Sequence, residues 1–189
     1  NTAGKSVESV DSGTPNVVVE VSAPENRAVN LGALVANGGR VDVHASIVNQ
    51  DGIVHADAIG VDATGQIILQ ASGELQLGAA SETRATGGSV QLAGKTVATR
   101  GKVEAKRVRV TAEDLRHEGT ITAPGGLIEI SAEGIALIAG VLDASDPSGA
   151  GGTVEITADS VSLQGATVDA SGATGGGTVH LGGGWQGGG

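Results

Sequence analysis

The feature that most limits the fold of this chain is a short phrase that recurs along it. The phrase consists of two glycines, one spacer residue and a run in which apolar and polar residues alternate, as in Gly-Gly-Thr-Val-Glu-Ile-Thr-Ala. Copies with both glycines lie at residues 38–45, 87–92, 125–132, 151–158 and 176–181. Recurrence at this spacing predicts a solenoid, in which each repeat buries its apolar face against the next.

Weaker copies of the phrase, without the double glycine, lie at residues 67–71 and 107–112. One apolar residue of each copy serves as its anchor, and the anchors are Val41, Ile68, Val90, Val108, Ile128, Val154 and Val179. Successive anchors are separated by 27, 22, 18, 20, 26 and 25 residues. Each interval is long enough for three short strands and their turns, so the sequence predicts about seven coils with loops of differing length.

The alternation within each phrase has the period of a β-strand. In the copy at residues 151–158, Val154, Ile156 and Ala158 share one face, and Glu155 and Thr157 share the other. A second phrase follows, with a short apolar pair, a glycine-containing bend and another short strand. Because each strand returns in the same direction after a full coil, the strands must pair in parallel. The sequence therefore predicts an all-β fold, a parallel β-helix.

The composition supports a narrow core of stacked aliphatic side chains. The chain contains no Phe, Tyr, Met or Cys and a single Trp, although 39% of its residues are hydrophobic. Aromatic residues normally fill much of a globular core, so this core must be narrow and uniform. Disorder is the competing interpretation of a chain with 33 glycines, and the regular placement of Val and Ile argues against it. We expect the glycines, including Gly165 and Gly172, at corners that need a positive φ.

The charge and the missing residue types exclude several functions. The net charge is −10, and a chain that lacks both a basic stripe and aromatic platforms has neither part of a nucleic-acid site. An acidic chain is also repelled by anionic lipids. It contains no apolar run long enough for a membrane span. Without cysteine there is no disulfide framework, which does not exclude secretion.

The repeats divide the chain into three parts. Residues 1–27 are an N-terminal lead-in, polar and irregular over 1–16, with a strand-like run over 17–21. Residues 28–184 hold the β-helix repeats, and residues 185–189 are a Gly-rich C-terminal tail. Trp185 in this tail can cover an open end of the core, which we favour, or act as a recognition anchor. Because the chain begins with Asn, we expect a processed product or a piece of a longer protein.

Candidate sites for chemistry are weak. The histidines His44, His55, His117 and His180 have no His or Cys partner at ligand spacing, so we expect exposed histidines and no metal site. Asp42, Glu129 and Glu155 occupy one outward position of the repeat and could form an acidic column, as a lyase or glycosidase would need. Gln91 and Arg109 occupy the same position in other coils and interrupt it. We therefore predict no catalytic residue, no cofactor and no enzyme.

Several phrases together resemble the filamentous haemagglutinin-like exoproteins of two-partner secretion systems. They are Val-Asn-Leu-Gly-Ala-Leu-Val-Ala at 29–36 and the phrases at 47–53, 151–158, 168–172 and 182–187. The resemblance implies a right-handed β-helix and export through a dedicated outer-membrane transporter. It also implies a place outside the bacterial cell or on its surface, and roles in adhesion, aggregation or biofilm formation. It supplies no catalytic residues for this stretch.

Three functional hypotheses follow. The first is a structural, adhesive rod segment, which presents other parts at a distance or stacks end to end on copies of itself or on flanking β-helix coils. The second is a module that binds an exopolysaccharide or a host glycan. Its candidate ligand-binding residues form the densest basic run of the chain: Arg100, Lys102, Lys106, Arg107 and Arg109. The third is a polysaccharide-degrading enzyme, which the interrupted acidic column disfavours.

Overall fold

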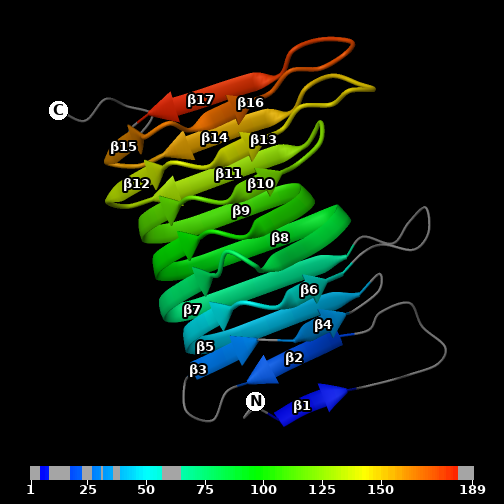
Figure 1. The fold of residues 1–189 in the computed structure, drawn as a ribbon, viewed down its shortest axis with the longest axis vertical. Helices are drawn as coiled ribbons and strands as arrows, with labels where there is room; N and C mark the ends of the chain where they lie inside the picture. Colours follow the sequence, from blue (N-terminus) through cyan, green and yellow to red (C-terminus); the bar gives the residue numbers. More distant parts are fainter. Residues whose placement is uncertain are drawn as a thin grey trace.

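A computed structural model of the chain describes residues 5–8, 18–22, 27–30, 32–35, 39–56 and 65–182. Their regular structure is entirely β, with 17 strands joined in one continuous sheet. Among these residues we find no helix that could cross a membrane. The strands stack as a right-handed parallel β-helix, which confirms the predicted fold class (Figure 1).

The strands follow one another along the chain. They are β1 (Lys5–Glu8), β2 (Val18–Ser22), β3 (Arg27–Asn30), β4 (Ala33–Val35), β5 (Arg40–Gln50), β6 (Ile53–His55), β7 (Gln66–Leu77), β8 (Glu82–Thr99) and β9 (Lys102–His117). They continue with β10 (Thr120–Thr122), β11 (Leu127–Ala132), β12 (Ile135–Ile138), β13 (Val141–Asp143), β14 (Thr153–Thr157), β15 (Ser160–Leu163), β16 (Thr167–Asp169) and β17 (Thr178–Gly182).

The coils have three faces, which we call A, B and C in the order in which the chain crosses them. Face A holds β2, β11, β14 and β17 and the parts of β5, β7, β8 and β9 that start at residues 40, 66, 89 and 107. Face B holds β3, β12 and β15 and the parts that start at 47, 74, 96 and 114. Face C holds β4, β6, β10, β13 and β16 and the parts that start at 82 and 102. The described strands thus make seven coils, and β17 begins an eighth.

The predicted anchors of the repeat lie in one inward column on face A, with one exception. Val41, Val90, Val108, Ile128, Val154 and Val179 stack in register. The seventh anchor, Ile68, is wrong by one residue. Ile67 is the fully buried member of the column, between Val41 and Val90, and Ile68 is on the outward side. A shift of one residue moves a side chain to the opposite face of a strand, so the two positions are not equivalent.

The space enclosed by the three faces is filled by Val, Ile, Leu and Ala. Ile128, Ile130, Ala136, Ile138 and Leu142 are fully buried within a single coil, and the buried residues of the coils form one continuous cluster. Burial of a side chain the size of Ile or Leu stabilises a fold by about 1.5–3 kcal/mol. Stacked aliphatic residues therefore build the core without aromatic residues, as the composition indicates.

The N-terminal end of the stack contains more strand than the sequence suggested. The expected strand over 17–21 is present as β2, which pairs in parallel with β5 and so extends the face A stack into the lead-in. The prediction of irregular structure over 1–16 is wrong for Lys5–Glu8, because these residues form β1, which pairs antiparallel with β2. The rest of that segment, and the C-terminal tail with Trp185, lie outside the described residues.

Glycines with a positive φ are fewer than predicted. Among the described residues they are Gly87, Gly125 and Gly165, so the expectation is confirmed for Gly165. Gly172 lies in the turn between β16 and β17, as predicted, but without a positive φ, and it is a glycine for a different reason. A Cβ atom at Gly172 would lie 2.1 Å from the backbone nitrogen of Gly151 in the coil below.

Close approach between coils explains most of the other corner glycines. A Cβ atom at Gly119 would lie 2.2 Å from the carbonyl oxygen of Gly101, and one at Gly140 would lie 2.2 Å from that of Gly119. Gly101, Gly119 and Gly140 therefore form a column at the corner between faces B and C. At these three positions one coil rests closely on the previous one, and a Cβ atom would overlap its atoms.

We predict that Gly119→Ala destabilises the protein by roughly 1–3 kcal/mol, the usual cost of forcing an extra carbon into a packed site. The added methyl group would push Thr120 away from the Gly101 carbonyl oxygen, to which the Thr120 N–H donates at 3.0 Å. Gly176→Ala is the matched control, since a Cβ atom there meets nothing within 4 Å. Chemical denaturation followed by circular dichroism measures both variants, and equal stabilities would contradict the packing argument.

Candidate functional site

The five basic residues singled out from the sequence lie around one coil and not in one patch. Arg100 lies at the corner between faces B and C, and Lys102 lies on face C. Lys106 forms the corner between faces C and A, and Arg107 and Arg109 lie on face A. Ten consecutive residues wind around much of one coil, so their side chains point away from the stack in different directions. The structure brings only Lys106 and Arg107 together at one described hollow.

Two of the five residues are neutralised by glutamates from the next coil. The Arg100 Nε donates to a Glu118 carboxylate oxygen at 3.0 Å. The hydrogen bond from Arg116, and then that from Arg100, hold the pKa of the Glu118 carboxyl below its usual range. The Arg109 guanidinium donates to the Glu129 carboxylate at 2.8 and 3.0 Å. Arg100 and Arg109 therefore balance charge on the surface instead of offering free positive charge.

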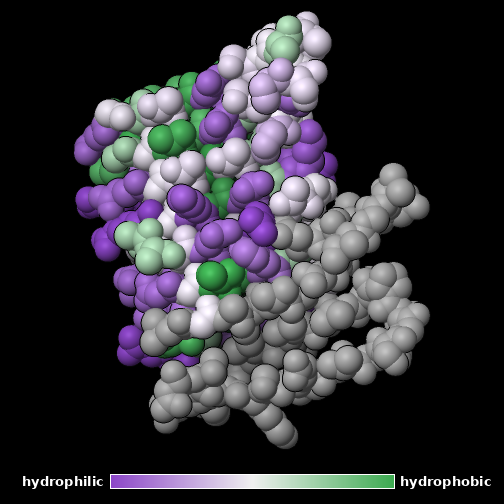
Figure 2. Space-filling model, turned by 45° about the vertical axis from the view of Figure 1, so that its right-hand side comes forward, coloured by the Kyte–Doolittle hydropathy of each residue, from purple (hydrophilic) through white to green (hydrophobic). Residues whose placement is uncertain are grey.

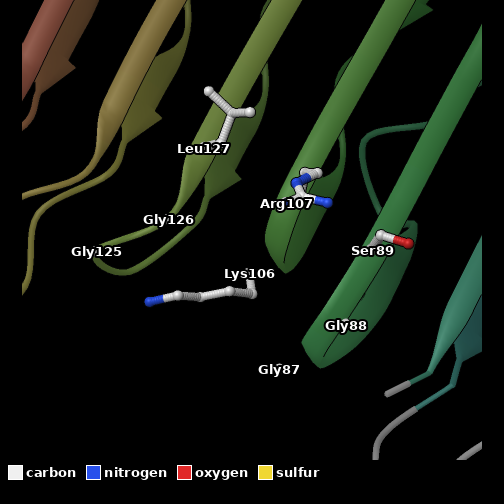
Figure 3. A pocket seen from close by; sticks show the side chains of 8 residues that line it. All are labelled: Gly87, Gly88, Ser89, Lys106, Arg107, Gly125, Gly126 and Leu127. Carbon is white, nitrogen blue, oxygen red and sulfur yellow. The ribbon is translucent and has the colours of Figure 1, made fainter.

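Lys106 and Arg107 line a surface recess of about 470 Å³, with Gly87, Gly88, Ser89, Gly125, Gly126 and Leu127 as the other lining residues (Figure 3). The recess exists because the turn from face C to face A differs in length between coils. In this coil the turn is Lys106 alone, whereas residues 86–88 and 124–126 form it in the neighbouring coils. The longer turns rise on both sides of the shorter one and leave a hollow between them.

The two basic side chains of the recess have different surroundings. The Lys106 Nζ donates to the Pro124 carbonyl oxygen at 2.8 Å, and Figure 3 shows this side chain extended toward the turn that contains Gly125. Arg107 is exposed on β9, in register with Ser89 on β8 and Leu127 on β11. Unlike Arg109, it has no ion-pair partner among the residues that the structure describes.

The outward column on face A holds the predicted residues in the predicted order, except that Ile68 separates Asp42 from Gln91. Gln91, Arg109, Glu129 and Glu155 follow one another in register, and His180 lies next to Glu155. Of the two neighbouring carboxylates, those of Glu129 and Glu155, the first forms an ion pair with Arg109. In the described part of the chain, no three His, Asp or Glu residues are grouped so that they could hold a metal ion.

The histidines do not all lie on the surface. His44 and His180 are exposed on the outward side of face A, as predicted. The Nε2 of His55 lies 2.9 Å from a Glu82 carboxylate oxygen. The expectation of an exposed residue is wrong for His117, which is fully buried.

His117 forms part of the core and is held by two hydrogen bonds. Its Nδ1 lies 2.7 Å from the hydroxyl of Thr99 in the coil below, and its Nε2 lies 3.1 Å from the Val141 carbonyl oxygen in the coil above. Since a carbonyl can only accept, Nε2 carries the proton and Nδ1 accepts from the Thr99 hydroxyl. Burial lowers the pKa of His117, although the hydrogen bond to Val141 opposes this effect. The buried ring is therefore neutral at pH 7.

The register of the repeat contains the signal that would have placed His117. Its slot is the second inward position of face B, which Leu77, Thr99 and Ile138 occupy in other coils. Aligning the repeats on face B would have predicted burial for this position. The prediction of an exposed His117 rested instead on the absence of a His or Cys partner at ligand spacing, which carries no information about burial.

Comparisons with known proteins add no further assignment: no family model, no curated protein and no solved structure matches this chain.

We predict that His117→Leu reduces the loss of stability on acidification. Because the folded-state pKa of His117 is lowered, the unfolded chain binds a proton at a higher pH, near the ordinary value of 6.5. The stabilisation is therefore complete above pH 6.5 and is lost as the pH falls toward the folded-state value. Leucine is a suitable replacement because Leu77 fills the same slot.

The measurement is the free energy of unfolding of both proteins at pH 7 and pH 5. The carboxyls with lowered pKa values, those of Glu118, Asp146 and Asp169, titrate below this interval and remain in both proteins. A parallel decline of the two proteins between pH 7 and pH 5 would show that His117 does not cause the acid sensitivity.

Proposed function

We propose that this chain is a segment of a structural, adhesive rod in a large secreted surface protein that acts in cell adhesion, aggregation or biofilm formation. The observation that carries the proposal is the C-terminal coil, whose inward side chains are uncovered. On β17, Val179 is 42% exposed and Leu181 is 46% exposed, whereas Val154 and Ile156 are fully buried in the same slots one coil earlier.

The same end of the stack offers unpaired backbone. Among the described strands, β17 pairs with β14 on one side only. Leu163 on β15 is also 46% exposed, so the apolar interior is open on more than one face. An exposed apolar strand edge favours pairing with a further strand. The occupant that matches it best is another coil of the same kind, from a second copy of the chain or from a flanking part of the parent protein.

The two ends of the stack differ in their strand pairing. At the other end, β1 lies antiparallel against β2 (Figure 1). A parallel stack of identical coils can be lengthened without changing its cross-section, as a rod that holds other parts at a distance requires. In this proposal the protein is secreted through an outer-membrane transporter, because the exoproteins that its sequence resembles use this export route.

The face of the stack drawn in Figure 2 favours a spacer role over lateral assembly. Figure 2 shows hydrophilic and hydrophobic residues in small interspersed groups over the coloured part of this face. Broad apolar patches mark protein-protein interfaces on other proteins, and the coloured residues of this view form none. The ion pair of Arg109 with Glu129 further disfavours a polysaccharide-degrading enzyme, which would need free acids in that column.

We predict that the purified chain associates through β17 and that Leu181→Lys weakens the association roughly tenfold or more, since a buried lysine must lose its hydration without a partner. Light scattering and negative-stain microscopy across a concentration series measure the mass and the shape of the assemblies. Elongated particles one coil wide are the expected product.

Thr178→Lys is the matched control, because this residue lies on the same strand in the outward column of face A. It should leave the association constant close to that of the unsubstituted chain. Equal effects of the two lysines would show that association does not use the inward side of β17. A chain that stays monomeric across the whole series would overturn end-to-end assembly.

A further inference from the structure

We infer that the recess at the Lys106 turn binds an acidic sugar residue through its carboxylate or sulfate group. This site is independent of the rod proposal, because it lies on the side of the stack and not at its end. Its volume of about 470 Å³ lies within the range of roughly 300–1,000 Å³ that small-ligand pockets occupy. The neighbouring coils border the recess on two sides, and a sugar unit could enter it from the solvent side.

Arg107 is the residue that would hold the acidic group. The other two arginines of this basic run, Arg100 and Arg109, each have a glutamate partner from the next coil at about the same distance. At the position in register with Arg107, that coil supplies Leu127 instead. The Arg107 guanidinium therefore keeps its planar set of donors free among the described residues, and such a fork matches a carboxylate or sulfate.

The surroundings of Arg107 suit one sugar ring. Ser89, in register on the other side, adds a hydroxyl that can donate or accept. Leu127 supplies an apolar surface for the C–H groups of a ring. Four glycines line the recess without side chains, which lets a ligand come close to the backbone. Because the recess has no aromatic platform, a neutral sugar would lack its usual stacking partner.

Carboxylates near Lys106 limit the charge of the ligand. The Asp146 carboxylate accepts hydrogen bonds from Ser148 and Gly149, and these, with a smaller contribution from the charge of Lys106, lower the pKa of the Asp146 carboxyl. Glu104 lines a smaller hollow of about 160 Å³ on the face C side of Lys106. Negative charge on both flanks of Lys106 directs an anion toward Arg107 and favours a singly charged group over a phosphate.

The test is isothermal titration of the full chain at low salt with three probes of matched length. These are an oligogalacturonate, a sulfated galactose oligomer and a neutral galactose oligomer. We expect binding of one or both acidic probes, with weaker binding at higher salt, and no measurable binding of the neutral probe. The stronger of the two acidic probes distinguishes a carboxylate ligand from a sulfate ligand.

Two substitutions assign the binding to the recess. Arg107→Gln should weaken it about tenfold, as expected for the loss of a charge-assisted hydrogen bond. Leu127→Glu should weaken it to a similar extent without removing any basic residue, because it places a carboxylate beside Arg107 in the same register that brings Glu129 within 2.8 Å of Arg109. Leu127→Gln removes only the apolar surface and should weaken binding less than Leu127→Glu, and Arg109→Gln is the control that should retain the affinity.

Several results would overturn the inference. If Arg107→Gln and Arg109→Gln weaken binding equally, the attraction comes from the general surface charge. Equal affinity for the neutral probe would exclude an acidic group as the recognised feature, and no binding of either acidic probe would exclude the site. Competition by sodium sulfate as effective as that by the oligosaccharides would show an anion site without sugar recognition.

Discussion

The backbone hydrogen bonds between successive coils are the interaction on which the rest of this structure depends. Strands inside the stack find their partners in the coils on either side, and the pairing of β8 with β9 runs across all three faces. This pairing fixes the register, and the register stacks like positions into columns. The column in which a residue lies then determines whether its side chain is buried, which charge it pairs with and whether glycine is needed. A residue's partners therefore lie about one coil away in the sequence.

The stack of strands could be predicted from the sequence because each coil contains a phrase that is recognisable without knowledge of the other coils. Valine and isoleucine anchors with a period-two alternation specify the inward side of face A without knowledge of any contact. The exception at Ile67-Ile68-Leu69 has a physical cause, since three apolar residues in a row fit either phase of the alternation. Only pairing with Val41 and Val90 in the adjacent coils selects Ile67 as the inward residue.

The candidate site could not be predicted as well, because proximity in sequence does not mean proximity in space within a coil. The basic run from Arg100 to Arg109 is continuous in sequence, yet it turns around two corners of the stack. The partners that neutralise two of its members come from 18 and 20 residues away. His117 shows the same limit, because its hydrogen-bond partners Thr99 and Val141 belong to the coils on either side.

Variation among coils is concentrated at one corner, and this determines where such a fold can carry recognition. At the corner between faces B and C, Gly101, Gly119 and Gly140 lie against the previous coil, and the described turns there are only two to four residues long. Among the fully described turns at the corner between faces C and A, the length ranges from the single residue Lys106 to the segment at 145–152. Differences in turn length produce hollows there without disturbing the hydrogen bonds of the strands. A β-helix of this kind can therefore acquire a binding site at the second corner while its core columns stay unchanged.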